Sequence, residues 1–410
     1  MNKEKSMKQK KIAFILPEGS LPIPATMGGA IETLMTMMLN ENETKGNYDF
    51  LFVYSGEENK KVSYKHSVCY ACKLHNRSGK VWDFLTKVWY KLGTYFPKSF
   101  PAVSRYYRDA AKIAKKEKAD YVIAEGLYPT NFKNFSYIWD KKNLALHIHS
   151  EVAKNPVSDE ILEKTIAISD FVAQRWNENT PEKMKDTYVW KNSIRREKFD
   201  VNMTKDQRNE VRKSLGYYED DFVVFFCGRM IQVKGVKELI EAVLGIENEK
   251  VKLLIIGSDD FARGDKGEYA KEVRALVEKN PDRIKHLGYV DNAKLYQYYK
   301  SADLQVVPSL WEEAAGLVAI EGMVSKIPLI VTKSGGMIEY VHKDYTKIVP
   351  KDEHIVQTLQ KEIVYLYENP SVRDEMSQGA YDFAKRFSQE QYYQDFCDMM
   401  EQWEKDIQGR

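Results

Sequence analysis

The stretch PSLWEEAAGLVAIEGMVSKIPLIVTKSGGMIE, residues 308–339, combines apolar runs, glycines and glutamates in a pattern that indicates both the fold and a ligand site. It begins at the end of the apolar run LQVVP, which predicts a short buried strand, and residues 327–331 form a second run of this kind. Residues 317–324, between the two runs, have helical character. Glycines follow both predicted strands, at Gly316 and at Gly335-Gly336, where a backbone without side chains can approach a ligand closely.

Acidic residues are interleaved with these glycines. Glu313 and Glu321 flank Gly316, and Glu339 follows the later glycine pair. Carboxylates on such loops can accept hydrogen bonds from sugar hydroxyls, while the free N–H groups of a helix beginning near Leu317 can bind phosphate. The stretch therefore predicts a pocket for a polyhydroxylated anion such as a nucleotide sugar.

The same alternation of strand and helix extends through the whole chain. Buried strands are expected in both halves, each followed by a helical segment, and the runs are apolar enough to be covered on both faces. This pattern predicts an α/β protein with parallel sheets covered by helices. The expected strands are 11–17, 49–54, 119–124, 143–148, 221–227 and 251–257.

Two further loops have the composition of anion sites. GRMIQVKG, residues 228–235, places Arg229 and Lys234 between a strand and a helix, where cations and free amides together attract an anion. Gly28 and Gly29 end the loop after the first strand, without the G-x-G-x-x-G of dinucleotide-binding proteins. This glycine pair fits either a phosphate-binding loop or an ordinary turn.

These motifs, in this order, resemble glycosyltransferase family 4, whose members are retaining enzymes with the GT-B fold. The resemblance includes the Glu-x7-Glu spacing of Glu313 and Glu321, the G-R-x4-K-G of residues 228–235 and the glycine pair after the first strand. It covers nearly the whole chain and implies two Rossmann-like domains with parallel sheets facing across a cleft. A C-terminal helix would return to the first domain.

The resemblance also implies roles for individual residues. Arg229 and Lys234, with Gly28 and Gly29, would hold the diphosphate of a nucleotide-sugar donor. Glu321 would bind the ribose, Glu313 the transferred sugar, and Gly316 and Leu317 would belong to the same donor loop. His149, at the end of the strand LALHI, would lie beside the sugar and the acceptor oxygen as a hydrogen-bond donor. No metal ion and no cofactor besides the nucleotide-sugar co-substrate are implied.

Domain limits are expected near residue 187 and near residue 388. The first domain, residues 1–187 with the terminal helix 388–410, would bind the acceptor, and residues 188–387 would bind the donor. Residues 1–118 carry 21 Lys and Arg against 11 Asp and Glu, so the remainder of the chain is acidic. Residues 200–215 are highly charged and predict a solvated helix.

Two segments allow other interpretations. His66, Cys69, Cys72 and His75 resemble a zinc ligand set in type, but a strand over VCYACKL would place the two cysteines on opposite faces. Residues 80–108 combine basic and aromatic side chains, which suits contact with anionic lipid headgroups. An amphipathic helix packed on its own domain explains the same segment.

The composition is that of a globular protein, with 43% hydrophobic and 30% charged residues. No apolar run approaches the roughly 20 residues that cross a bilayer, and four cysteines suit a reducing compartment. We expect a cytoplasmic enzyme, peripheral on the inner face of the cell membrane, and no nucleic-acid partner. The predicted function is transfer of a sugar from a nucleoside-diphosphate sugar, UDP-linked, to a glycan or lipid-linked acceptor in surface polysaccharide or glycoconjugate assembly. The alternatives are a non-catalytic GT-B-like binding subunit and another GT-B chemistry such as sugar-nucleotide epimerisation.

Overall fold

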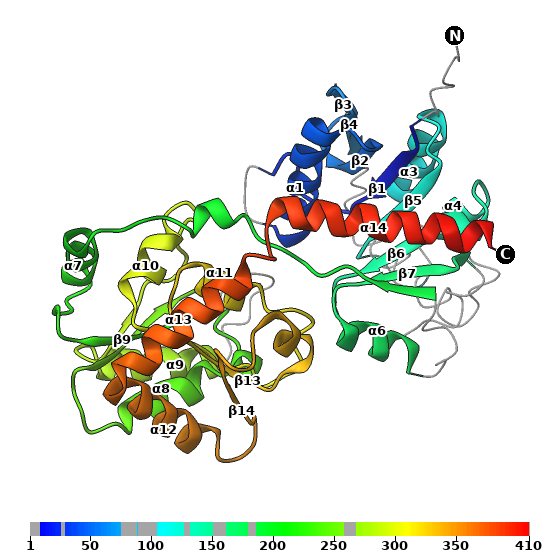
Figure 1. Cartoon of the computed structure of the whole chain (residues 1–410). Coiled ribbons are helices and arrows are strands. Elements are labelled where there is room, and N and C mark those ends of the chain that lie inside the picture. The colour runs from blue at the N-terminus through cyan, green and yellow to red at the C-terminus, as the bar shows by residue number, and fades with distance from the viewer. Residues whose placement is uncertain are drawn as a thin grey trace, which may run out of the picture. The chain divides into compact units, whose positions relative to one another are not determined.

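The computed structural model of the chain describes residues 9–25, 29–74, 88, 105–126, 132–150, 161–178, 186–257 and 268–409. The chain divides into two compact units (Figure 1). Unit 1 comprises Met1–Asn192 with Gln389–Arg410, and unit 2 comprises Ser193–Ser388. Within the described ranges, no helix combines the length and the apolar character that a membrane span requires.

Unit 1 is built on an eight-stranded sheet. Neighbouring strands are parallel except for the edge pair β3 and β4, which is antiparallel. The strands are β1 (Lys11–Ile15), β2 (Asp49–Gly56), β3 (Lys60–Ser63), β4 (Ser67–Lys73), β5 (Tyr121–Glu125), β6 (Leu144–Ile148), β7 (Lys164–Ala167) and β8 (Thr187–Val189). Their order across the sheet is β3-β4-β2-β1-β5-β6-β7-β8. The central strands β1, β5 and β6 are buried except at Lys11, in keeping with their largely apolar sequences.

Helices flank the sheet of unit 1, and the last of them comes from the far end of the chain. They are α1 (Ala30–Lys45), α3 (Arg105–Lys116), α4 (Lys133–Ser136), α6 (Asp170–Asn177) and α14 (Gln389–Gln408), with the 3-10 turn η2 (Lys141–Asn143). α14 lies beside α1 (Figure 1). Phe396 of α14 packs against Phe14 and Phe50, and Trp190 stacks on Tyr392 with ring centroids 4.3 Å apart. The predicted return of the C-terminal helix to the first domain is therefore confirmed.

The boundary between the units lies later than the predicted residue 187. The reason is β8, which pairs in register with β7 and extends the sheet of unit 1 through Val189. Trp190 follows directly and is buried in the core of unit 1, so the unit ends only at Asn192. At the other end, unit 2 closes at Ser388, beside the predicted limit of 387.

Unit 2 contains a six-stranded parallel sheet in the order β11-β10-β9-β12-β13-β14. The strands are β9 (Phe222–Cys227), β10 (Val251–Ile256), β11 (Ile284–His286), β12 (Leu304–Val307), β13 (Leu329–Thr332) and β14 (Lys347–Val349). The helices are α7 (Lys205–Ser214), α8 (Val236–Leu244), α9 (Glu268–Lys279), α10 (Leu295–Ser301), α11 (Leu317–Val324), α12 (Ile355–Glu368) and α13 (Pro370–Ala384), with η4 (Arg196–Lys198), η5 (Gln232–Lys234) and η6 (Gly335–Tyr340). Apolar clusters on the two faces of this sheet give unit 2 a core of its own.

One helix of unit 2 differs from its predicted environment. Residues 200–215 predict a solvated helix, yet Arg212 of α7 is only 1% exposed. Its guanidinium pairs with Asp303 and also donates to the carbonyl oxygens of Ser301 and Asp221. Arg208, one turn earlier, pairs with the same carboxylate. These contacts attach α7 to the start of β12.

Candidate functional site

The loops singled out in the second half of the sequence emerge at one edge of unit 2. β9 and β12 are parallel neighbours, and β12 pairs in turn with β13. Because parallel strands end at the same edge of a sheet, the loops after them meet there, which is the usual position of ligand sites in α/β proteins. Residues 228–235 follow β9, residues 308–316 follow β12, and residues 333–339 follow β13.

Hydrogen bonds join two of these loops. The backbone N–H of Glu313 donates to Ser334 Oγ at 3.0 Å, and the N–H of Gly336 donates to the carbonyl oxygen of Glu313 at 2.7 Å. Ser334 Oγ donates in turn to the carbonyl oxygen of Trp311. The loops after β12 and β13 therefore form one cross-linked wall rather than two independent segments.

The third loop contacts this wall through an ion pair. Lys234 Nζ donates to Glu313 Oε1 at 2.5 Å, and the hydroxyl of Ser309 donates to the same oxygen at 2.5 Å. The side chains of Lys234 and Glu313 are 20% and 12% exposed, so the pair lies in a partly closed site that solvent can still reach. Trp311 covers one side of the lysine, with Nζ 5.2 Å from the ring centroid.

Gly235 makes the close approach of the first loop possible. Its φ is +69°, and a Cβ added there would lie 2.0 Å from the carbonyl oxygen of Pro308. A side chain at this position would thus separate the lysine loop from the glutamate loop. Arg229 lies on the same loop as Lys234 with an exposed side chain, and no carboxylate pairs with it among the described residues.

Glu321 lies near this loop wall but contacts other groups. Gly316 immediately precedes α11, Leu317 is the first residue of that helix, and Glu321 follows on it. Glu321 Oε2 accepts a hydrogen bond from Tyr299 Oη at 2.7 Å. Burial raises the pKa of Glu321 from 4.5 to about 7, against the opposing effects of the Tyr299 hydroxyl and the charge of Lys198.

In unit 1, His149 belongs to a buried cluster with Glu125 and His147. Glu125 ends β5 and lies in register with His147 of β6. Glu125 Oε2 lies 2.9 Å from His147 Nδ1 and 2.6 Å from His149 Nε2. The side chains of Glu125 and His147 are fully buried, whereas that of His149 is 12% exposed.

The electrostatics of this cluster follow from its burial. Burial disfavours ionisation of Glu125, but the two histidines outweigh it and hold the pKa of this carboxyl below its usual range. Burial lowers the pKa of His147, helped by the neighbouring His149. The ring of His147 also stacks on Trp190 with centroids 4.9 Å apart. Glu125 was missed in the sequence, although a carboxylate that ends an apolar run beside LALHIH is a signal for it.

The glycine pair of unit 1 can be placed only in part. Gly28 lies outside the described residues. Gly29 is extended and immediately precedes α1. The carboxylate of Glu32 lies so close that a Cβ on Gly29 would be 2.2 Å from Oε2, and the other oxygen accepts from the backbone N–H of Leu21. An acidic group thus already lies at this helix N-terminus.

The described members of the set His66, Cys69, Cys72 and His75 do not come together as metal ligands. Cys69 is buried in the core of unit 1, and burial raises its pKa to about 12. Cys72 lies on the opposite face of β4, where burial raises the pKa of its thiol and the charges of Asp109 and Glu18 raise this pKa further. His75 lies outside the described residues. Within the described ranges, the one group close enough to hold a metal ion is Glu125, His147 and His149, whose ligand atoms lie within 4.8 Å of one another.

Most of the basic aromatic segment 80–108 also lies outside the described residues. Val88 is exposed, but Tyr106 and Tyr107 of α3 are 2% and 3% exposed. Tyr106 donates to the carbonyl oxygens of Leu16 and Val53. These two tyrosines pack within unit 1, which for them favours the alternative of a helix packed on its own domain over contact with lipid headgroups.

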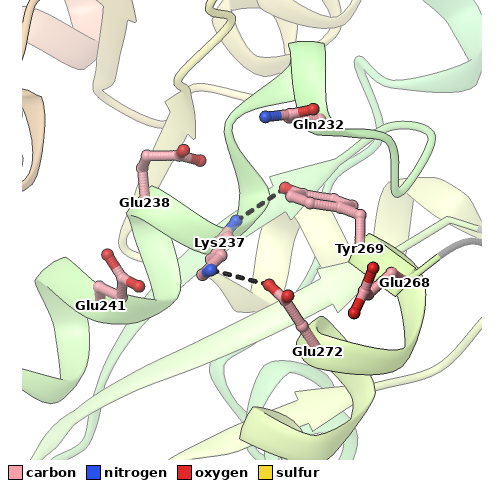
Figure 2. A pocket seen from close by; sticks show the side chains of 7 residues that line it. All are labelled: Gln232, Lys237, Glu238, Glu241, Glu268, Tyr269 and Glu272. Atoms are coloured by element: carbon pink, nitrogen blue, oxygen red, sulfur yellow. Dashed lines mark hydrogen bonds and ion pairs between the residues drawn. The ribbon is translucent and has the colours of Figure 1, made fainter.

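A pocket of 380 Å³ lies between α8 and α9 and is also lined by Gln232 of the loop after β9 (Figure 2). Figure 2 shows four glutamates around it, Glu238, Glu241, Glu268 and Glu272, with Lys237 bound to Glu272 at 2.8 Å. The hydroxyl of Tyr269 accepts from the backbone N–H of Lys237 at 3.1 Å and so caps the start of α8. The negative lining does not suit an anionic ligand.

Comparisons with known proteins show that much of unit 2 is similar to glycosyltransferases. Residues 207–383 match the family model described as glycosyl transferases group 1. An uncharacterized glycosyltransferase of Methanocaldococcus jannaschii is 34% identical over 172 residues, which is 42% of this chain and 42% of that protein. The lipopolysaccharide 1,2-N-acetylglucosaminetransferase of Salmonella typhimurium is 25% identical over 344 residues, covering 81% of this chain and 84% of that protein.

Solved structures extend the likeness to the whole fold. A glycosyltransferase from Rickettsia africae has a TM-score of 0.73 at 16% identity and covers 97% of this chain and 99% of its own. Anabaena HepE in complex with UDP and glucose has a TM-score of 0.67 at 17% identity, with 96% and 100% covered. The chain thus has the GT-B fold, and its residues 207–383 match the glycosyl transferases group 1 model.

Proposed function

We propose that this chain is a retaining glycosyltransferase of the hexosyltransferase type. It would transfer a sugar from a UDP-linked donor to a glycan or lipid-linked acceptor, in the assembly of a surface polysaccharide or glycoconjugate. The group 1 match in unit 2 supports the reaction class. The names of two relatives, one acting on lipopolysaccharide and one bound to UDP and glucose, support the acceptor and donor classes. With such an acceptor, we expect the enzyme in the cytoplasm, peripheral on the inner face of the membrane.

The observation that carries this proposal is the cluster of Lys234, Glu313 and Ser309 at the carboxyl edge of the unit 2 sheet. Breaking the anomeric C–O bond leaves negative charge on the departing diphosphate. Lys234 and Arg229, both on the loop after β9, are the cations placed to stabilise that charge. Preorganised cations of this kind can replace a metal ion, so we propose a reaction without metal or cofactor.

The carboxylates would hold the sugar portions of the donor. Glu313 is oriented by the Ser309 hydroxyl and by backbone bonds to the next loop, so it can accept hydrogen bonds from the hydroxyls of the transferred sugar. Glu321, held by Tyr299, would bind the ribose. Gly316 and Leu317 would line the same donor site, with Gly29 and Gly28 contributing to the diphosphate. His149 would act next to the sugar and the acceptor.

A panel of UDP- and GDP-sugars, scored by thermal shift and by slow donor hydrolysis, tests this proposal. We expect one UDP-sugar to raise the melting temperature and to be hydrolysed, and Lys234→Ala to reduce both effects. A ligand-induced shift without turnover under any condition would indicate a binding subunit instead. Release of an isomerised nucleotide sugar without acceptor would indicate epimerisation. If no nucleotide sugar shifted the melting temperature, the proposal would be wrong.

A further inference from the structure

The buried carboxylate of Glu125 has contacts that its place in the sheet alone does not require. One oxygen, Oε2, lies within hydrogen-bond distance of a ring nitrogen of His147, at 2.9 Å, and of a ring nitrogen of His149, at 2.6 Å. The other oxygen is buried and has no hydrogen-bond partner among the described residues. A fully buried carboxylate is costly unless its charge is compensated by hydrogen bonds or a cation. The two imidazoles therefore offset the free-energy cost of burying the Glu125 carboxylate.

These contacts determine which ring nitrogens carry protons. An ionised carboxylate only accepts hydrogen bonds, so both nitrogens that face Oε2 must be protonated. A neutral imidazole has a single N–H group, and in His149 this group is the one on Nε2. Nδ1 of His149 is then left as the only ring nitrogen that can meet a substrate.

His147 has a different part in the cluster. It is fully buried and stacked on Trp190, and within the described part of the chain its Nε2 has no hydrogen-bond partner. It cannot reach a substrate, but it holds the other side of Oε2 and so fixes the carboxylate against rotation. His149, in contrast, is the one member of the cluster with an exposed edge.

We propose that Glu125 is a positioning residue that orients His149 through Nε2, so that Nδ1 is presented to an oxygen of the transferred sugar or of the acceptor. This inference rests on the proposed function for the identity of the substrate. It alters the expected role of His149, because a neutral ring would accept a hydrogen bond at Nδ1. His149 could donate to the substrate only as an imidazolium.

The first test is spectroscopic and needs no substrate. In protein labelled with ¹⁵N-histidine, we expect a downfield ring N–H resonance that Glu125 protects from exchange, assigned to His149 by its loss in His149→Gln. Glu125→Leu should abolish this resonance, because no acceptor remains. Glu125→Gln should retain it at higher field, because an amide oxygen is a weaker acceptor than a carboxylate. An unchanged resonance in Glu125→Leu would overturn the proposal.

The second test is kinetic and separates positioning from folding. We expect Glu125→Leu to lower donor turnover about tenfold or more, by analogy with loss of a hydrogen bond to a charged group. Glu125→Gln should recover part of the loss, with the melting-temperature shift caused by UDP unchanged in both. In a His149→Gln background, Glu125→Gln should have no further effect, because Glu125 acts through that histidine. A further loss in the double variant would contradict the proposal.

Glu43→Gln is the matched control. Glu43 is a carboxylate of the same unit that also accepts two N–H groups, from the backbone of Lys65 and His66. We expect its resonance pattern and turnover to equal those of the unaltered protein. If UDP and every nucleotide sugar failed to bind, the proposed function would be wrong, while the resonance would still test the orientation of His149. One zinc ion per purified chain, lost in Glu125→Gln, would make the cluster a metal site and overturn the positioning role.

Discussion

Replacing Lys234 by alanine tests the proposed donor site most directly. The ammonium lies 2.5 Å from Glu313 Oε1, in a site where the two side chains are 20% and 12% exposed. Glu313 retains its bond to Ser309 in the variant, so the fold should lose only about 1–2 kcal/mol, between the values for exposed and buried pairs. The effect on the ligand should be larger than the effect on the fold.

The size of that effect follows from the contact that is lost. A hydrogen bond to a charged group contributes about 1.5–3 kcal/mol, which corresponds to roughly 10- to 150-fold in the dissociation constant of UDP. The carboxylate of Glu313 would also face the diphosphate without its cation. We therefore expect Lys234→Ala with Glu313→Gln to bind UDP more tightly than Lys234→Ala alone.

Isothermal titration with UDP at two salt concentrations measures these affinities. Lys250→Ala is the matched control, because Lys250 also pairs with a carboxylate of unit 2, Asp220 at 2.6 Å, but does so on the surface. It removes the same charge and should leave UDP binding unchanged. Equal affinities for Lys234→Ala, Lys250→Ala and the unaltered protein would refute the assignment of Lys234 to the diphosphate.

Three further predictions follow from buried groups. Asp303→Ala should lower the free energy of unfolding of unit 2 by about 3–5 kcal/mol, because it leaves the buried guanidinium of Arg212 without its carboxylate. Arg208→Ala should lower it by about 1 kcal/mol or less, and urea unfolding measures both values. Because burial raises the pKa of Glu321 from 4.5 to about 7, its stabilising contribution is present below pH 4.5 and lost as the pH rises to 7. Melting temperatures at pH 5 and pH 8 should therefore differ less in Glu321→Gln than in the unaltered protein, and an equal difference would contradict the shift. Ending the chain at Ser388 removes Phe396, Met400 and Trp403 from the core of unit 1, and the burial of each side chain contributes about 1.5–3 kcal/mol to stability. Circular dichroism should then show cooperative unfolding of unit 2 alone. Cooperative unfolding of unit 1 in this variant would contradict the prediction.

The loops of the proposed donor site could be predicted because their chemistry is local in sequence. A strand, a glycine and two cations within residues 222–235 specify both the turn and its charge, and Gly235 has the left-handed conformation that such a turn requires. The pairing of Lys234 with Glu313 was beyond this reasoning. It depends on the close approach of the Gly235 and Pro308 backbones, which only the folded sheet establishes.

The failures have the same physical origin. Arg212 was assigned to a solvated helix because α7 is rich in charges, but its partner Asp303 lies far along the chain and becomes its neighbour only through the sheet. Glu125 was overlooked because the expected strand stopped at Ala124, one residue short of the carboxylate. The boundary was expected near residue 187 instead of at Asn192 because a strand as short as β8 has too little sequence to show periodicity.

The proposed donor site contains both partners that a nucleotide sugar would exchange. Lys234 donates to Glu313, and a donor would offer a diphosphate to the lysine and sugar hydroxyls to the glutamate. Each group would thus leave one charged partner for another polar one, so that neither the cation nor the carboxylate is left unsatisfied in either state. Ser309 and Ser334 would keep Glu313 in position during the exchange, because their hydrogen bonds to its side chain and backbone do not involve Lys234. A diphosphate alone satisfies only half of this arrangement, which is a physical reason for the site to favour the complete nucleotide sugar over the free nucleotide.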